Sequence, residues 1–205
     1  MIILIKAVIF DYAGVVGKES HENDVLKAIS EEFGSKPSFR VVKDVYANRI
    51  ETYGLTKRVS EKNVMQRFAR HLGISDVKKL KSVWDRFYAT KSKLDEKVVD
   101  IAKNLKKSGY HIAILSNVFE HRARILKRTG GYNNFKPVLL SCKIGMRKPD
   151  EKIYRYAVKR LNARPQECIF IDDREKNLVS AEKIGMKTIL FKNAKQLEMD
   201  LKEYL

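Results

Sequence analysis

The sequence has little cysteine, no long hydrophobic run and no histidine cluster. Its two cysteines, Cys142 and Cys168, form no Cys-x-x-Cys pair, which excludes a disulfide framework and favours a reduced, cytoplasmic location. No stretch approaches the roughly 18 apolar residues that a membrane-spanning helix needs, so a membrane partner is not expected. The four histidines show no metal-ligand spacing, so any metal site is expected to use other side chains.

Positive charge is abundant. The chain of 205 residues has a formal net charge of +17, and such a charge can attract nucleic acid, an anionic surface or an anionic substrate. One basic cluster is Arg122, Arg124, Lys127 and Arg128, and a second is Lys148, Lys152, Arg155 and Lys159. The second cluster has helical spacing opposite apolar residues, which is typical of a solvated helix face. Nucleic-acid binding is therefore not expected despite the charge.

Two parts of the chain differ in their pattern. From residue 95 onward, apolar runs of strand length alternate with helical segments of 10–15 residues, which predicts a doubly wound parallel sheet covered by helices on both sides. The expected strands are residues 2–10, 111–115, 138–141, 168–171 and 187–191. The expected helices between and after them are residues 95–107, 119–129, 149–161, 175–184 and 194–204.

The segment 18–90 shows helical patterns alone. Helices are expected at residues 23–33, 39–53, 60–71 and 75–89. We therefore predict an α/β core made of residues 1–17 and 91–205, interrupted after its first strand by a helical cap at 18–90. A block inserted at this point lies over the carboxyl edge of the sheet, where it can act as a lid. Trp84, Phe87 and Tyr88 are expected to fill the core of that small bundle.

Polar residues recur where the predicted strands end or the following helices begin. In chain order they are Asp11, Ser116 with Asn117, Lys148, and Asp172 with Asp173 and Asn177. The carboxyl ends of parallel strands share one edge of the sheet, so these side chains are expected to converge on one pocket.

The chemistry of this set indicates phosphoryl transfer. Three carboxylates, those of Asp11, Asp172 and Asp173, can hold a hard cation such as Mg²⁺ through oxygen. Lys148 supplies a positive charge, and Ser116 with the amides at the start of the next helix can hold phosphate oxygens. A carboxylate that faces a bound phosphate can attack phosphorus and form an aspartyl-phosphate, which water then hydrolyses.

The ordered motifs resemble those of the haloacid dehalogenase (HAD) superfamily. They are Asp11, Ser116-Asn117, Lys148-Pro149-Asp150 and Phe170-Ile171-Asp172-Asp173 with Asn177. The segments around the last two motifs are similar to the subgroup with an inserted helical cap, which includes the phosphatase domains of epoxide hydrolases and small sugar-phosphate phosphatases. The resemblance covers residues 1–17 and about 95–205, while the cap matches in position and helical character alone.

This resemblance implies roles for individual residues. Asp11 would be the nucleophile and a Mg²⁺ ligand, and Lys148 would bind the phosphoryl group and orient Asp11. Ser116 and Asn117 would also contact the phosphate. The implied cofactor is Mg²⁺, and the implied substrate is a small phosphorylated metabolite.

The resemblance also implies how the metal would be held. Asp173 would be its main distal ligand, and Asp172 would lie beside it or just behind it. The backbone carbonyl of Ala13 would complete the protein ligands together with Asp11, and Asn177 would support the site.

The side chain of Ala13 departs from the family pattern. Phosphatases of the family usually carry Asp there, which protonates the leaving group and then activates water. Three readings stay open. In the first, the protein hydrolyses phosphates with good leaving groups. In the second, it performs C–P hydrolysis, because Asp11-Tyr12-Ala13-Gly14 resembles the motif of phosphonoacetaldehyde hydrolases, which also use a cap lysine. In the third, it is a weak or non-catalytic member that binds a phosphate or a partner.

The sequence thus predicts a Mg²⁺-dependent hydrolase of a small phosphorylated metabolite that acts through an aspartyl-phosphate on Asp11. A non-catalytic binding protein is the alternative from another class. The sequence leaves a monomer and a homodimer equally open.

Overall fold

The computed structural model describes residues 4–18, 22–34, 36–50, 55, 60–91 and 93–205. At its centre lies a five-stranded sheet with the order β3-β2-β1-β4-β5, in which all neighbouring strands are parallel. The strands are β1 (Ala7–Phe10), β2 (His111–Ser116), β3 (Val138–Leu140), β4 (Cys168–Asp172) and β5 (Lys187–Leu190). The predicted doubly wound parallel sheet is confirmed.

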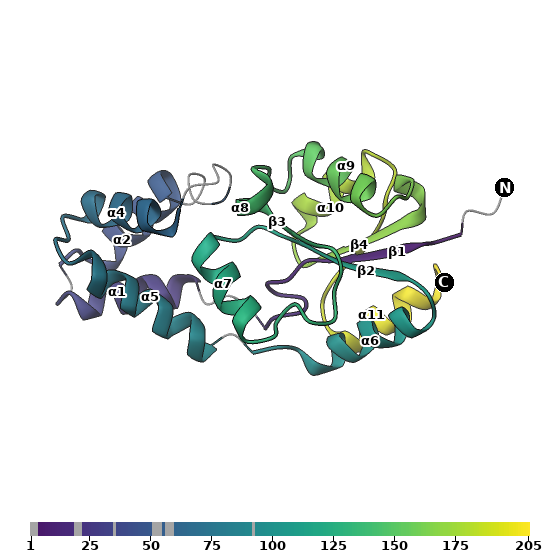
Figure 1. Ribbon diagram of the computed structural model, residues 1–205, viewed down its shortest axis with the longest axis horizontal. Helices are drawn as coiled ribbons and strands as arrows, with labels where there is room; N and C mark the ends of the chain where they lie inside the picture. Colours follow the sequence, from purple (N-terminus) through teal and green to yellow (C-terminus); the bar gives the residue numbers. More distant parts are fainter. Residues whose placement is uncertain (1–3, 19–21, 35, 51–54, 56–59, 92) are drawn as a thin grey trace.

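Alternate residues of the strands face two layers of helices. Val8 and Phe10 of β1 pack toward α6 (Glu96–Lys107), α7 (Glu120–Arg128) and α11 (Ala194–Lys202). The other face of the sheet packs against α9 (Glu151–Arg160) and α10 (Glu175–Glu182). Figure 1 shows α6 and α11 below the sheet and α9 and α10 above it. Burial on both faces explains why these strands have nearly continuous apolar sequences.

The first strand is shorter than predicted. Residues 2–10 were expected to form it, but β1 begins at Ala7, and residues 1–3 lie outside the described part. Ala7 pairs with His111 and Cys168, the first residues of β2 and β4, and the backbone of Lys6 still bonds to Glu167 and His111, where both neighbouring strands begin. Leu4 is accordingly 74% exposed, although its apolar side chain continues the hydrophobic run.

The expected strand at 138–141 is also shorter, because a helical turn replaces its end. β3 ends at Leu140, and the short helix α8 (Ser141–Ile144) follows directly. The hydroxyl of Ser141 accepts a hydrogen bond of 3.0 Å from the amide of Val118, which ties α8 to the loop after β2. A second short element, the 3₁₀ turn η2 (Pro165–Glu167), precedes β4.

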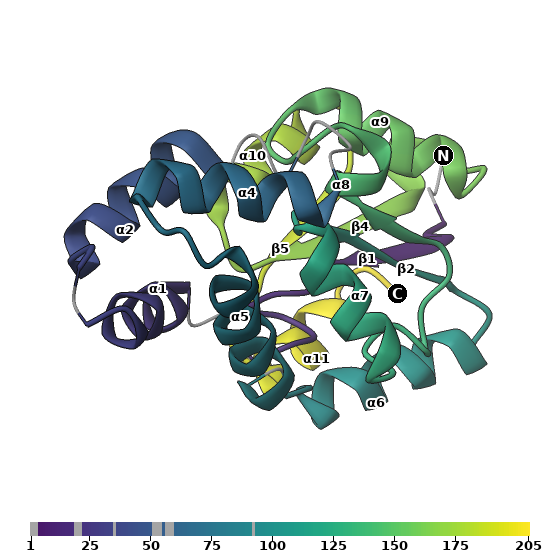
Figure 2. The same cartoon turned by 60° about the vertical axis from the view of Figure 1, so that its left-hand side comes forward.

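A bundle of helices follows β1 and lies beside the carboxyl edge of the sheet (Figures 1 and 2). It consists of α1 (Glu22–Glu32), α2 (Phe39–Val45), the π-helical turn η1 (Tyr46–Ile50), α4 (Glu61–Leu72) and α5 (Val77–Lys91). The single helix expected at 39–53 is thus α2 continued by a π-turn, and residues 51–53 lie outside the described part. The inserted helical cap is confirmed as a structural element, whereas its limits at residues 18 and 90 stay predictions.

The cap has its own apolar core, which extends into one helix of the α/β core. Trp84 and Tyr88 are buried in it and Phe87 packs at its edge, as predicted. Phe119 and Ile125 from the α7 region belong to the same cluster. The cap therefore packs on α7 through apolar contacts.

Ion pairs reinforce the same junction. Arg124 of α7 lies 3.0 Å from Glu61 of α4 and 3.7 Å from Asp85 of α5, measured between side-chain nitrogen and oxygen atoms. Lys81 of α5 lies 2.7 Å from Glu61. None of the described helices is both long and apolar enough to cross a membrane.

Candidate active site

The predicted polar residues gather at the carboxyl edge of the central strands. Asp11 follows β1 directly, Ser116 ends β2 and Asp172 ends β4, and β1 lies between the other two strands. The amide of Asp11 donates a hydrogen bond of 2.8 Å to the carbonyl of Ile171, so the pairing with β4 continues to the first carboxylate. The topology thus brings together residues that are more than 100 positions apart in the sequence.

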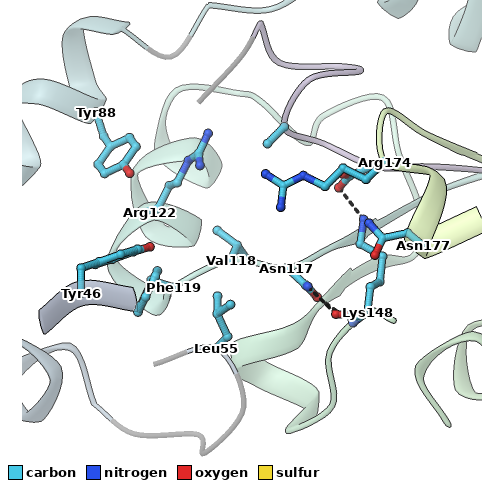
Figure 3. Close-up of a pocket in the computed structure, with 12 residues that line it drawn as sticks. Tyr46, Leu55, Tyr88, Asn117, Val118, Phe119, Arg122, Lys148, Arg174 and Asn177 are labelled. Carbon is cyan, nitrogen blue, oxygen red and sulfur yellow. Dashed lines mark hydrogen bonds and ion pairs between the residues drawn. The ribbon is translucent and has the colours of Figure 1, made fainter. Parts of the chain in front are cut away.

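Lys148 connects two of the carboxylates. Its Nζ lies 2.8 Å from Oδ1 of Asp11 and 2.6 Å from Oδ2 of Asp172, and the residue is 2% exposed. Asn117 fixes the backbone of Lys148 on both sides: its Nδ2 donates to the carbonyl and its Oδ1 accepts from the amide, each at 2.9 Å (Figure 3). The lysine is therefore held in place from the loop that follows β2.

The carboxylate of Asp172 is fully occupied by hydrogen bonds. Oδ2 accepts from Lys148, the amide of Arg174 donates to Oδ1 at 2.9 Å, and Nδ2 of Asn177 donates to both oxygens at 2.9 and 3.0 Å. Tyr154 holds Asn177 in turn, because its hydroxyl donates to the Asn177 carbonyl at 2.8 Å. Asp172 is thus suited to orient Lys148 and has little capacity left for a further ligand.

Asp173 has the free capacity that Asp172 lacks. Its Oδ1 is buried and has no hydrogen-bond partner among the described residues. One oxygen from each of Asp11, Asp172 and Asp173 lies within 4.8 Å of the others. Gly14 makes room for Asp173, because a Cβ at position 14 would lie 2.4 Å from its Oδ2. An unsatisfied buried oxygen among clustered carboxylates fits a hard divalent cation, and Mg²⁺ is the common choice for such an oxygen site.

Burial sets the ionisation of the central pair. It raises the pKa of Asp11 to about 6, against the opposing charge of Lys148 and with a further upward contribution from Asp172. Burial lowers the pKa of Lys148, but Asp11 and Asp172 together outweigh it, so the pKa lies above its usual value and the ammonium stays charged. Burial, with Asp172 as the second cause, also raises the pKa of Asp173.

The carboxylate of Asp11 presents one free oxygen. Oδ1 accepts from the amide of Tyr12 at 2.6 Å and from Lys148, while none of the described residues donates a hydrogen bond to Oδ2. Asp11 also lines a pocket that lies between the sheet edge and the cap. A fixed carboxylate with one free oxygen beside a permanent positive charge is arranged for nucleophilic attack.

The residue after Asp11 points away from this pocket. Tyr12 is buried against Tyr132, with ring centroids 5.2 Å apart, and packs so closely on Gly17 and Gly131 that a Cβ on either glycine would lie within 2.7 Å of its ring or hydroxyl. Ala13 is the next residue, and it lines the pocket. The position where the family that the sequence resembles usually carries a second acid therefore faces the pocket in this chain.

The structure brings together Asp11, Asn117, Lys148, Asp172, Asp173 and Asn177 as expected from the sequence. Ser116 is also at the sheet edge, but it is buried and does not line the pocket, whereas Asn117, Val118 and Phe119 do. Its contact with phosphate stays a prediction. The roles of all these residues are likewise inferred from their placement.

Sequence reasoning missed the far wall of the pocket. Tyr46 and Leu55 come from the cap, Tyr88 comes from α5, and Arg122 comes from α7 (Figure 3). Arg122 belonged to a basic cluster, and Tyr88 was assigned only to the cap core. Neither pattern shows that the two side chains meet, with the guanidinium of Arg122 lying 4.8 Å from the centroid of the Tyr88 ring.

Two known proteins are similar to about half of this chain. A glyceraldehyde 3-phosphate phosphatase of Pyrococcus furiosus is 38% identical over 105 residues, which cover 49% of this chain and 43% of the relative. A bifunctional epoxide hydrolase 2 of Sus scrofa is 31% identical over 121 residues, which cover 56% of this chain and 21% of the relative. The matches thus span less than half the length of these two relatives.

Solved structures share the fold. A HAD family enzyme of Bacteroides thetaiotaomicron in complex with magnesium superposes with a TM-score of 0.76 at 20% identity, covering 92% of this chain and 93% of that one. A HAD phosphatase of Thermococcus onnurineus gives a TM-score of 0.71 at 20% identity, covering 96% and 98%. The family model described as haloacid dehalogenase-like hydrolase matches residues 5–185. With that match over most of its length, the chain belongs to the haloacid dehalogenase-like hydrolase family.

Proposed function

We propose that the protein is a Mg²⁺-dependent phosphatase of a small phosphorylated metabolite and that Asp11 is its nucleophile. The observation that carries the proposal is the buried ion-paired group of Asp11, Lys148 and Asp172 beside the unsatisfied oxygen of Asp173. Two further facts support it. Two relatives are named as glyceraldehyde 3-phosphate phosphatases, and a structural neighbour was crystallised with magnesium and inorganic phosphate.

In the proposed reaction, Oδ2 of Asp11 attacks phosphorus, an O–P bond forms, and the bond to the leaving oxygen breaks with its electron pair. Lys148 holds Asp11 in position and balances negative charge as the phosphoryl group transfers. Water then attacks phosphorus of the aspartyl-phosphate, which releases inorganic phosphate and restores the carboxylate. When bound, Mg²⁺ would be held by Asp11, Asp173 and the carbonyl of Ala13, and it would neutralise charge on the phosphoryl oxygens.

The C–P hydrolase alternative finds less support in the pocket. That chemistry needs a cap lysine that reaches the substrate. Among the described residues that line the pocket, Lys148 is the one lysine, and it is committed to two ion pairs. The phosphatase proposal needs no such residue.

Activity should require Mg²⁺ and disappear when a chelator is added. Asp173→Asn should raise the Mg²⁺ concentration for half-maximal activity by about ten-fold or more. Removing a residue that only hydrogen-bonds to a metal ligand already lowers metal affinity by about ten-fold, and removing a direct ligand lowers it further. The measurement is phosphate release across a Mg²⁺ titration, together with the rise of the melting temperature on adding Mg²⁺. Asp100→Asn, on the exposed side of α6, is the matched control. Full activity in chelator would contradict the proposed cofactor.

Lys148→Met should lower kcat by roughly 10²–10³-fold, comparable to losing one preorganised electrostatic contact in other enzymes. The variant leaves Asp11 and Asp172 buried side by side without their shared counter-charge, so its melting temperature should also fall. Circular dichroism would establish whether the variant is folded before rates are compared. Lys152→Met, an exposed substitution on α9, should match the unmodified protein. A folded Lys148→Met variant with undiminished kcat would remove this lysine from the mechanism.

A further inference from the structure

The pocket has two chemically different ends. Figure 3 places Lys148 and Asn177 on one side and Tyr46, Tyr88 and Arg122 on the other. The first side belongs to the proposed phosphoryl site. The second side is formed by the cap and α7, and the reaction as derived above gives it no role.

Among the described residues, Arg122 has no carboxylate of the kind that usually neutralises a half-buried arginine. Its Nε is buried and without a hydrogen-bond partner, and no carboxylate of the described residues lies within ion-pair distance of its guanidinium. Among the described residues, the guanidinium packs on the face of the Tyr88 ring. A buried donor of a charged group is costly when it is unpaired, so the buried Nε of Arg122 favours an incoming acceptor.

The neighbouring cations on the same junction show the contrast. Arg124 and Lys81 are both neutralised by Glu61 and Asp85. Arg122, two residues before Arg124, points instead into the pocket, and Arg174 extends toward the same space from the opposite wall (Figure 3).

We propose that the substrate carries a second anionic group besides its phosphate and that Arg122 binds that group. The inference rests on the proposed phosphatase function, because it assumes that the phosphate lies at Asp11 and Lys148. A planar guanidinium presents paired donors that match either a carboxylate or a second phosphate. The substrate class is therefore a small phosphate monoester with a carboxylate or phosphate at its other end.

The test compares substrates that differ in the second group alone. Phosphoglycolate carries a carboxylate where ethyl phosphate carries a methyl group, and ethylene glycol bisphosphate carries a second phosphate. The unmodified protein should show a kcat/KM for one of the two compounds with a second anionic group that exceeds that for ethyl phosphate by at least about ten-fold, the worth of one hydrogen bond to a charged group. Whichever of the two compounds has the larger kcat/KM relative to ethyl phosphate identifies the second group as a carboxylate or a phosphate.

Variants assign the preference to Arg122. R122Q should bring the ratio of kcat/KM values close to one, and R122K, which keeps the charge, should restore part of it. R128Q removes the same charge from an exposed position on α7 and should leave the ratio unchanged. A ratio near one in the unmodified protein, or equal losses on all three substrates in R122Q, would overturn the inference. So would a preference for phenyl phosphate that survives in R122Q, because that result would assign the far wall to ring stacking.

Calorimetry separates this inference from the proposed function. Phosphoglycolate, ethylene glycol bisphosphate and ethyl phosphate are titrated, with Mg²⁺, into D11N and into the double variant D11N/R122Q, so binding is measured without turnover. Tighter binding of phosphoglycolate or of the bisphosphate that depends on Arg122 supports the inference even where no substrate is hydrolysed, an outcome that would refute the phosphatase proposal alone. Equal affinities for all three compounds in D11N overturn the inference and leave the phosphatase proposal standing.

Discussion

Asp11→Asn should reduce hydrolysis of every phosphate monoester by on the order of 10⁴-fold or more, because losing a nucleophile leaves only the contribution of binding and electrostatics. The amide has the size of the carboxylate, but it is a poor nucleophile and a weaker metal ligand. The measurement is phosphate release under single-turnover and steady-state conditions. Mass spectrometry of acid-quenched protein should show one added phosphoryl group in the unmodified chain and none in the variant.

The variant should also stay folded, and the reason lies in the electrostatics of the site. Burial raises the pKa of Asp11 to about 6, so above that pH the folded protein holds a charge that the unfolded chain would carry more easily. A neutral side chain removes this cost, and Lys148 keeps Asp172 as its partner. We therefore expect an unchanged or higher melting temperature at neutral pH in metal-free buffer. A folded variant with rates within a few-fold of the unmodified protein, in preparations free of other phosphatases, would contradict the covalent mechanism.

The gathering of the predicted residues at one edge of the sheet follows from the geometry of parallel sheets. Ser116 and Asp172 each end a buried strand and Asp11 directly follows one, and the carboxyl ends of such strands must meet at one edge. Proximity in space is then a consequence of local pattern and strand order. Lys148 joins these residues because it lies in the loop just before α9, and α9 covers one face of the same strands.

The far wall of the pocket could not be predicted in this way. Tyr46 lies on a π-turn, and Tyr88 and Arg122 meet only because the cap packs on α7. That packing depends on side chains from several helices at once, and no single segment carries its signal. Sequence patterns separate buried faces from exposed ones, but they do not show which half-buried arginine is neutralised by an ion pair and which faces a cavity.

The shortened first strand shows that the neighbouring strands also determine where a strand begins. The apolar run before Ala7 is long enough for several more strand residues, yet the strands on both sides begin at His111 and Cys168. Strand length is set by available partners as well as by hydrophobicity. The wrong start of this strand did not affect the predicted site, because the site lies at the carboxyl end, where β1 is paired with both neighbouring strands.

Ala13→Asp should raise kcat for alkyl phosphates by roughly 10²–10⁴-fold, the usual contribution of a positioned general acid or base. Ala13 lines the pocket two residues after Asp11, so a carboxylate there faces the leaving group that it would protonate. It would later accept a proton from the attacking water. The gain should be smallest for aryl and acyl phosphates, whose leaving groups need little protonation. The measurement is kcat for a series of phosphates ordered by the pKa of the leaving group.

Ala13→Asn is the matched control, because it adds nearly the same volume and polarity without a group that exchanges a proton at neutral pH. A dependence of rate on leaving-group pKa that is steep in the unmodified protein, flattens in Ala13→Asp and persists in Ala13→Asn would show that the missing acid limits hydrolysis. Equal or lower rates in a folded Ala13→Asp variant on every substrate would contradict this account. The pocket would then be built around a small residue at position 13, for close contact with a substrate or a cap side chain, and the non-catalytic or C–P hydrolase interpretation would gain support.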